Sequence, residues 1–122
     1  MNNQHKRLEG KVALITGASK GIGAGIAKAF GREGASVIVN YASDKTGAEK
    51  VVNEIVANGG KAIALCADVS REEAIAEIFK QTNEAFGRLD ILVNNAGVFK
   101  AIPIEQISAE EFNRHFSINV LG

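Results

Sequence analysis

Gly17, Gly21 and Gly23 stand where an apolar run passes into a helical pattern, and this arrangement is suited to binding phosphate. Gly17 lets the chain turn sharply, while Gly21 and Gly23 carry no side chain where a phosphate and a helix approach the backbone. The first amide groups of the helix then face the anion, and the helix dipole favours it. A glycine pattern alone is weak evidence, but a strand before it and a helix after it make it specific. We therefore expect a cradle for the pyrophosphate of a dinucleotide; a tight turn without a ligand is the alternative.

The elements that would position this turn alternate along the chain between apolar runs and helical patterns. Strands are expected over residues 11–16, 36–40, 61–67 and 90–94. Helices are expected over residues 21–32, 46–57 and 70–86, and from residue 108 into the chain end. This alternation predicts parallel strands joined by right-handed crossovers, and hence a Rossmann-type α/β fold with a doubly wound parallel sheet in three layers. Such sheets bind ligands at the carboxyl ends of their strands, so residues 16–23, 40–41, 68–69 and 94–97 are expected along one edge.

Side-chain patterns within these elements give further expectations. The buried face of the first helix is expected to consist of Ile22, Ile26, Ala29 and Phe30. Ser70 and Glu73 have the spacing of a capping box, which would open the third helix. Cys66, the only cysteine, lies in an apolar run and is expected to be buried and reduced, as in an intracellular protein.

Composition narrows the class of protein. The chain has 122 residues, of which 46% are hydrophobic and 23% charged, as in one ordinary globular domain. Fourteen basic and fourteen acidic residues cancel, which argues against a nucleic-acid-binding surface. We expect a flexible tail over residues 1–7 and a dinucleotide-binding half-domain over residues 8–122. No signal peptide, membrane-spanning run or metal-ligand spacing is evident, so a cytoplasmic protein without a metal is expected.

Four motifs resemble the short-chain dehydrogenase/reductase family, and the resemblance extends over almost the whole chain. They are Thr16 to Gly23, Asp68-Val69, Asn94 to Gly97, and Asn119. Within that family, the sequence most resembles those of 3-oxoacyl-carrier-protein reductases and glucose dehydrogenases. The resemblance implies hydride transfer between NADP(H) and an alcohol or ketone. Since that family's fold continues with further strands, it also implies that the chain is an N-terminal part, truncated after the fourth strand and the start of the following helix.

The candidate cofactor-binding residues lie at the four strand ends. They are Gly17, Ser19, Lys20, Gly21, Ile22, Gly23, Asn40, Tyr41, Ala42, Asp68, Val69, Asn95, Ala96 and Gly97. By the resemblance, Ser19, Lys20 and Ile22 would line the phosphate turn. Asn95 and the small residues after it would flank the ribose.

By the resemblance, Asp68 would accept a hydrogen bond from the adenine amino group, with the Val69 backbone beside the adenine. An acid at the start of the following helix is an equally good interpretation of Asp68.

Cofactor choice depends on the end of the second strand, where an acid would bind the ribose 2′-hydroxyl and repel a 2′-phosphate. Residues 40–43 contain no acid, and Lys20 could meet a 2′-phosphate. We therefore expect NADP(H) to be preferred, with NAD(H) possible. Asp44 could serve as an acid of the NAD type, but its position fits a helix cap better, and Lys20 could be a plain solvated lysine.

Catalytic residues are almost absent from the chain. Tyr41 and Lys45 match the family's catalytic Tyr-x-x-x-Lys in letters, but Tyr41 follows a strand beside the adenosine site, so we reject it. The family's serine and its true Tyr-x-x-x-Lys pair are missing. Asn119 alone matches a catalytic position, where it would hold a water of the proton relay; a polar residue on the helix face of Phe112 and Phe116 is the alternative.

These observations leave three hypotheses: part of a working oxidoreductase, a nucleotide-binding half-domain without turnover, or a self-associating structural half-domain. The apolar strand over residues 90–94 would lie unpaired at a sheet edge, which invites pairing with another copy. A homo-oligomer joined through this strand or through the helix after Ser108 is therefore expected, with no nucleic-acid or membrane partner.

Overall fold

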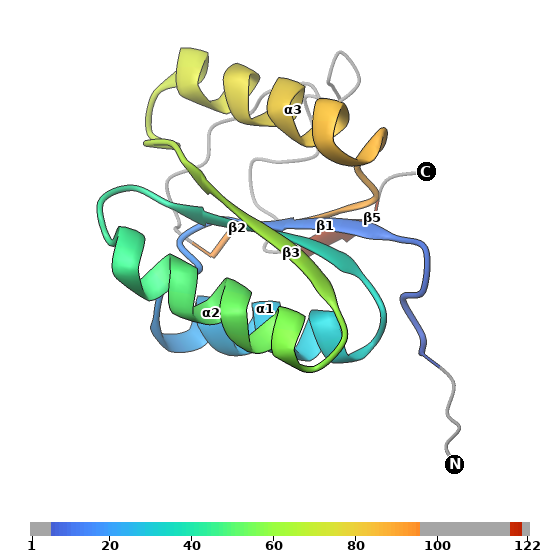
Figure 1. The fold of residues 1–122 in the computed structure, drawn as a ribbon. Helices are drawn as coiled ribbons and strands as arrows, with labels where there is room; N and C mark the ends of the chain where they lie inside the picture. The colour runs from blue at the N-terminus through green and yellow to red at the C-terminus, as the bar shows by residue number, and fades with distance from the viewer. Residues whose placement is uncertain (1–5, 96–117, 121–122) are drawn as a thin grey trace.

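The computed structural model of the chain describes residues 6–95 and 118–120 (Figure 1). Strands and helices alternate as the sequence predicts. The elements in chain order are β1 (Val12–Ile15), α1 (Gly21–Arg32), β2 (Ser36–Tyr41), α2 (Lys45–Ala57), β3 (Lys61–Cys66), α3 (Glu72–Phe86), β4 (Ile91–Val93) and β5 (Ile118–Val120).

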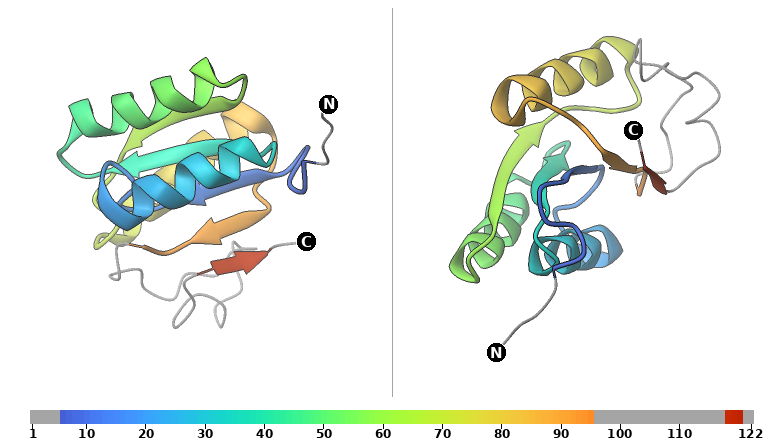
Figure 2. Two further views of the ribbon diagram at one scale, coloured as in Figure 1. Left: turned by 90° about the horizontal axis from the view of Figure 1, so that it is seen from below. Right: turned by 90° about the vertical axis from the view of Figure 1, so that its right-hand side faces the viewer.

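The sheet has the strand order β3-β2-β1-β4-β5, and β1 to β4 are parallel. The order reverses direction at β1, so the predicted doubly wound Rossmann-type topology is confirmed. Helices α1 and α2 cover one face and α3 covers the other, which gives three layers (Figures 1 and 2).

Two expectations about the end of the chain are wrong. Residues 118–120 form a strand and not part of a helix, since β5 pairs antiparallel with β4 and Asn119 stands opposite Leu92. Ile118 and Val120 are β-branched residues that favour a strand once a partner edge is available. Because β5 occupies this side of β4, β4 is not the unpaired edge proposed for self-association. The predicted helix start at Ser108 lies outside the described residues.

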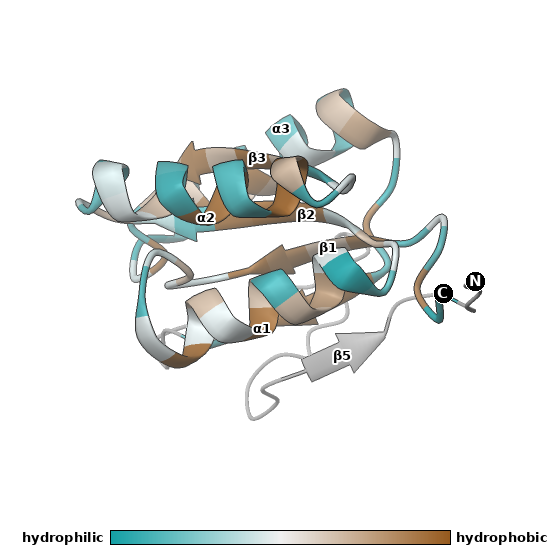
Figure 3. Cartoon of the chain, turned by 60° about the horizontal axis from the view of Figure 1, so that its bottom comes forward, coloured by the Kyte–Doolittle hydropathy of each residue, from teal (hydrophilic) through white to brown (hydrophobic). Residues whose placement is uncertain are grey.

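The central strands are buried on both faces, and this explains their continuous apolar runs. Ala13 and Ile15 of β1 join a core cluster with α1 and α2, whereas Leu14 joins the cluster beneath α3. All three side chains are fully buried. Figure 3 shows the hydrophobic strands in the middle, with helices of mixed character around them.

The buried face of α1 differs from the prediction, because the helix buries its smallest residues: Gly23, Ala24, Ala27 and Gly31. Ile22 is 77% exposed, and Ile26 and Phe30 are only half-buried. The reason is close approach. A Cβ on Gly31 would lie 2.8 Å from Cγ2 of Ile55 in α2, so a larger residue does not fit between the two helices.

Of the two helix caps predicted for α2 and α3, the first is confirmed and the second is wrong. The Asp44 carboxylate accepts a hydrogen bond from the Gly47 amide at 3.0 Å, so Asp44 is the N-cap of α2. Helix α3 begins at Glu72, two residues later than predicted, and its N-cap Arg71 makes no side-chain capping bond. The predicted capping box fails because the Ser70 hydroxyl donates to the Asp68 carboxylate.

Candidate functional site

The turn between β1 and α1 requires glycine at two positions. Gly17 has φ +61° and Gly21 has φ +62°, a left-handed conformation that residues with side chains rarely adopt. The space around Gly21 is open, since a Cβ built there would meet no atom within 4 Å. The turn is therefore fixed in shape, and its outer side is free to receive a ligand.

Gly23 is required for a different reason, the packing of α1 onto the turn. A Cβ at this position would lie 2.4 Å from the carbonyl oxygen of Gly17 and 2.6 Å from Nδ2 of Asn95. Asn95 lies just after β4, and its Nδ2 donates to the Gly17 carbonyl oxygen at 3.0 Å. The first turn of α1, the phosphate turn and the end of β4 thus meet with no spare room.

The beginning of the turn is held by neighbouring strands. The Thr16 amide donates to the Val93 oxygen at 3.0 Å, and the Thr16 hydroxyl lies 3.3 Å from Oδ1 of Asn94. The Gly17 amide donates to Oδ1 of Asn40 at 3.1 Å, and the Ala18 amide donates to the Asn40 carbonyl oxygen at 2.8 Å. These bonds anchor the turn to β4 on one side and to β2 on the other.

The rest of the turn leaves its amide groups unused. From Ser19 to Gly23, no backbone amide donates to any residue in the described ranges. The N-cap Lys20 makes no side-chain capping bond, and the first turn of α1 contains no acidic residue. Helix α2, by contrast, has its Asp44 cap. Consecutive unpaired amides at a helix N-terminus form a positively polarised concavity that fits an anion.

A groove runs from this turn between the N-terminal ends of α1 and α2. Three lysines lie along it, Lys20, Lys28 and Lys50. Lys28 pairs with Glu54 at 3.1 Å, while Lys20 forms no ion pair with any residue that the structure describes. Lys20 is thus a charge available at the end of the phosphate turn, as a 2′-phosphate would require.

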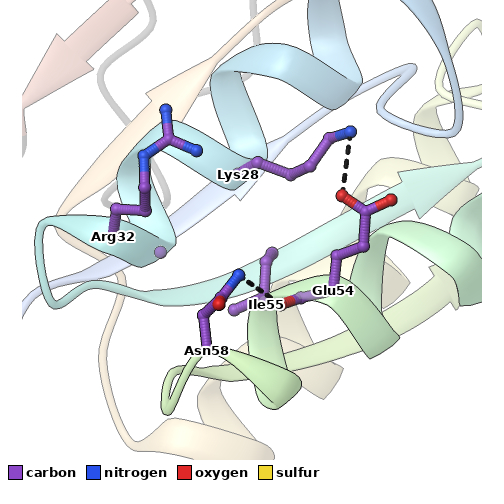
Figure 4. Close-up of a pocket in the computed structure, with 6 residues that line it drawn as sticks. Lys28, Arg32, Glu54, Ile55 and Asn58 are labelled. Carbon is purple, nitrogen blue, oxygen red and sulfur yellow. Dashed lines mark hydrogen bonds and ion pairs between the residues drawn. The ribbon is translucent and has the colours of Figure 1, made fainter.

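Further along, the same two helices enclose a cavity of about 40 Å³ beside the Lys28–Glu54 pair (Figure 4). Asn58 closes it by donating to the Glu54 carbonyl oxygen at 3.0 Å. This cavity has room for a few water molecules only.

The loop after β3 carries Asp68 and Val69. The Asp68 carboxylate accepts from the Ser70 hydroxyl at 2.6 Å and from the Ser70 amide at 3.0 Å. Both bonds stabilise the charged form, the hydroxyl more strongly, and they hold the pKa of Asp68 below its ordinary value. Val69 is buried against α3. Asp68 is therefore an ionised, exposed acceptor on an anchored loop.

Tyr41 is the last residue of β2 and Lys45 the first of α2. They do not lie one turn apart on a helix, as a catalytic Tyr-x-x-x-Lys pair would. Tyr41 is half-buried against the α1–α2 core cluster, and Lys45 lies 3.9 Å from Glu49.

Cys66 is exposed, so its predicted burial is wrong. Its thiol lies 3.4 Å from the carbonyl oxygen of Ala42. Cys66 ends β3, which is an edge strand of the sheet formed by the described residues. The thiol therefore stands beside one of the candidate cofactor positions.

Asp90 holds the amino-terminal ends of β1 and β4 together, at the opposite end of these strands from the candidate site. Its carboxylate accepts from the Val12 amide at 2.9 Å and from the Arg88 guanidinium at 2.6 Å. Burial by itself raises the pKa of Asp90, but the hydrogen bonds from Arg88 and Val12 outweigh it, so the pKa lies below its ordinary value. The sequence analysis did not single out this residue.

The strand ends bring the predicted site residues to one edge. Sheet order places the turn after β1, Tyr41 and Ala42 after β2, Asp68 after β3 and Asn95 after β4 along it. Neighbouring strands are about 4.8 Å apart, so these four strand ends extend over about 14 Å. Ala96 and Gly97 lie outside the described residues, and Asn119 stands on β5.

A model of the short chain dehydrogenase family matches residues 11–122. The chain belongs to this family. It is 55% identical to an uncharacterised oxidoreductase of Methylorubrum extorquens over 116 residues, which are 95% of this chain and 47% of that one. It is 50% identical to versicolorin reductase 1 of Aspergillus parasiticus over 122 residues, which are 100% of this chain and 46% of that one.

A solved relative carries a cofactor. A short chain dehydrogenase from Burkholderia cenocepacia in complex with NADP superimposes with a TM-score of 0.72 at 45% identity, covering 86% of this chain and 43% of that one. The chain spans about half the length of the curated relatives it matches. Short-chain dehydrogenases are oxidoreductases that use nicotinamide dinucleotides, and the unpaired amides of the glycine turn fit the phosphates of such a cofactor.

No metal centre is evident in the part of the chain that the structure describes: it contains no group of three or more His, Cys, Asp or Glu side chains placed to hold an ion. Among the same residues no helix is long and apolar enough to cross a membrane.

Proposed function

We propose that this chain is the NADP(H)-binding part of an oxidoreductase that transfers hydride between the nicotinamide cofactor and an alcohol or ketone. The observation that carries the proposal is the run of amides from Ser19 to Gly23 that have no acceptor among the residues that the structure describes. They would hold the pyrophosphate, and the glycines keep side chains out of its way.

The remaining contacts follow from the strand ends. Lys20 would pair with the 2′-phosphate, Asp68 would accept from the adenine amino group, and Asn95 would lie beside the ribose. Bound NADPH supplies the hydride. The residues described do not move a proton at the substrate, because the family's catalytic serine and Tyr-x-x-x-Lys pair are not in this sequence. We therefore propose that the 122-residue chain alone binds cofactor without turnover.

Preference for NADP(H) over NAD(H) rests on two features. Residues 40–43 carry no acid that would repel a 2′-phosphate, and Asp44, the nearest acid, is engaged as the cap of α2. The Burkholderia relative, whose structure contains NADP, supports the same choice.

Titration of the purified chain with NADPH and with NADH, followed by cofactor fluorescence, tests the proposal. Saturable binding of both is expected, tighter for NADPH. Absence of saturable binding for either nucleotide would contradict it. Ketone-dependent consumption of NADPH by the chain would contradict the absence of turnover.

A further inference from the structure

Asn40 is a buried polar residue next to the turn, with an exposed fraction of 2%. It lies on β2, between β1 and β3 in the sheet, one residue before the strand ends. Its sequence position predicts a contact with the cofactor. Its buried amide makes its contacts with the backbone of neighbouring strands instead.

The side-chain amide of Asn40 bonds to two segments at once, in addition to the backbone bonds by which each of them is tied to β2. Its Oδ1 accepts from the Gly17 amide in the phosphate turn at 3.1 Å. Its Nδ2 lies 3.1 Å from the Ala67 carbonyl oxygen and 3.3 Å from that of Leu65, on the segment that leads to Asp68.

The orientation of this amide is dictated by its partners. A backbone N–H only donates, so Oδ1 must face Gly17, and backbone carbonyls only accept, so Nδ2 must face β3. Both protons of Nδ2 are thereby used inside the protein. An aspartate in the same shape lacks the two donors, and an apolar residue lacks all three bonds.

We infer that Asn40 is a positioning residue of the nucleotide site, acting on the cofactor through Gly17 and Ala67 and not by touching it. The inference rests on the proposed function, and it assigns Asn40 a role other than the cofactor contact that its position suggests. Asn40 fixes the distance between the turn that would hold the pyrophosphate and the loop that would hold the adenine. A dinucleotide spans both segments, so its affinity depends on that distance. The affinity of a ligand that contacts only one of the two segments does not depend on that distance.

The test compares the wild-type chain with Asn40→Ala, using NADPH and adenosine, which lacks every phosphate, as the two ligands. We expect the Kd for NADPH to rise about tenfold or more, since the loss of these three bonds lets the segments drift apart. We expect the Kd for adenosine, which would contact only the loop after β3, to change less than threefold.

Thr82→Ala is the matched control, because Thr82 is a fully buried residue whose hydroxyl donates to a carbonyl, that of Ile78. It lies in α3, near the end of the helix remote from the turn. Both variants lose stability, but at a temperature where each is fully folded the control keeps wild-type affinity. If Asn40→Ala does not fold, Asn40→Thr removes the amide group with almost no loss of volume.

Three results would overturn the inference. Unchanged NADPH affinity in the folded variant leaves Asn40 with a structural role only. Equal loss for both ligands makes it a direct contact of the adenosine part. Lack of nucleotide binding by the wild-type chain overturns the proposed function, and the inference with it, before any variant is needed.

Discussion

Two glycines in the same helix, Gly23 and Gly25, offer a matched pair of substitutions to alanine. Gly23 lies against the phosphate turn, whereas a Cβ on Gly25 would meet nothing within 4 Å. Both changes gain the helix propensity of alanine, about 1 kcal/mol in favour of folding. Any difference between the two variants therefore measures the contact with the turn.

The expected difference follows from the contact distance. A Cβ on Gly23 would stand 2.4 Å from the Gly17 oxygen, and ordinary contact begins at 3.4 Å. The helix and the turn must therefore separate by about 1 Å. Such overpacking costs about 1–3 kcal/mol, which is our expected gap in stability between the two variants. We expect Gly25→Ala to be more stable than wild type by about 0.5–1 kcal/mol.

Urea denaturation followed by circular dichroism measures the free energy of unfolding, and NADPH fluorescence measures Kd. A displacement of about 1 Å should weaken NADPH binding by Gly23→Ala at least tenfold, because the first amides of α1 no longer converge with the turn. Gly25→Ala adds a methyl group in the open groove and should weaken NADPH binding much less than Gly23→Ala does. Equal stability and equal affinity of the two variants would refute the reasoning about this contact.

Three further outcomes are expected. Asp90→Asn should destabilise the fold at pH 7 by about 1–2 kcal/mol. Because the pKa of Asp90 lies below its ordinary 3.8, the wild-type chain should keep this advantage above about pH 4 and lose it as the pH falls through the lowered pKa of the folded chain. Urea denaturation of both proteins between pH 7 and pH 3 measures this difference. Lys20→Ala should weaken NADPH binding about tenfold and NADH binding less than twofold, and equal losses in fluorescence titration would deny Lys20 a phosphate role. Cys66, beside Ala42, should react more slowly with a thiol reagent when NADPH is bound, and an unchanged rate would place the cofactor elsewhere.

Local sequence signals predicted the elements well. The bounds of α1 agree with the prediction because the glycines at its start and the break at Gly34 are signals within the segment itself. The strands match within one or two residues, since strands buried on both faces read as continuous apolar runs. The edge that carries the site followed directly from parallel alternation.

The errors have a common origin in contacts between distant segments. Ile22 was predicted as buried by spacing alone, but the limited space between α1, α2 and the sheet selects small residues. The exposure of Cys66 depends on strand order, and the strand around Asn119 depends on pairing with β4. The role of Asn40 requires three strand ends to be brought together, which no single segment encodes.

The two ends of β1 depend on partners that come much later in the chain. The Val12 amide is held by Asp90, and the Gly17 carbonyl oxygen is held by Asn95, each 78 residues away. During synthesis, a nascent chain can form α1 and α2 early, because their own contacts are short-range. The phosphate turn, in contrast, cannot be completed until Asn95 has left the ribosome. If the turn binds a nucleotide as proposed, it would do so only after the first 95 residues have left the ribosome.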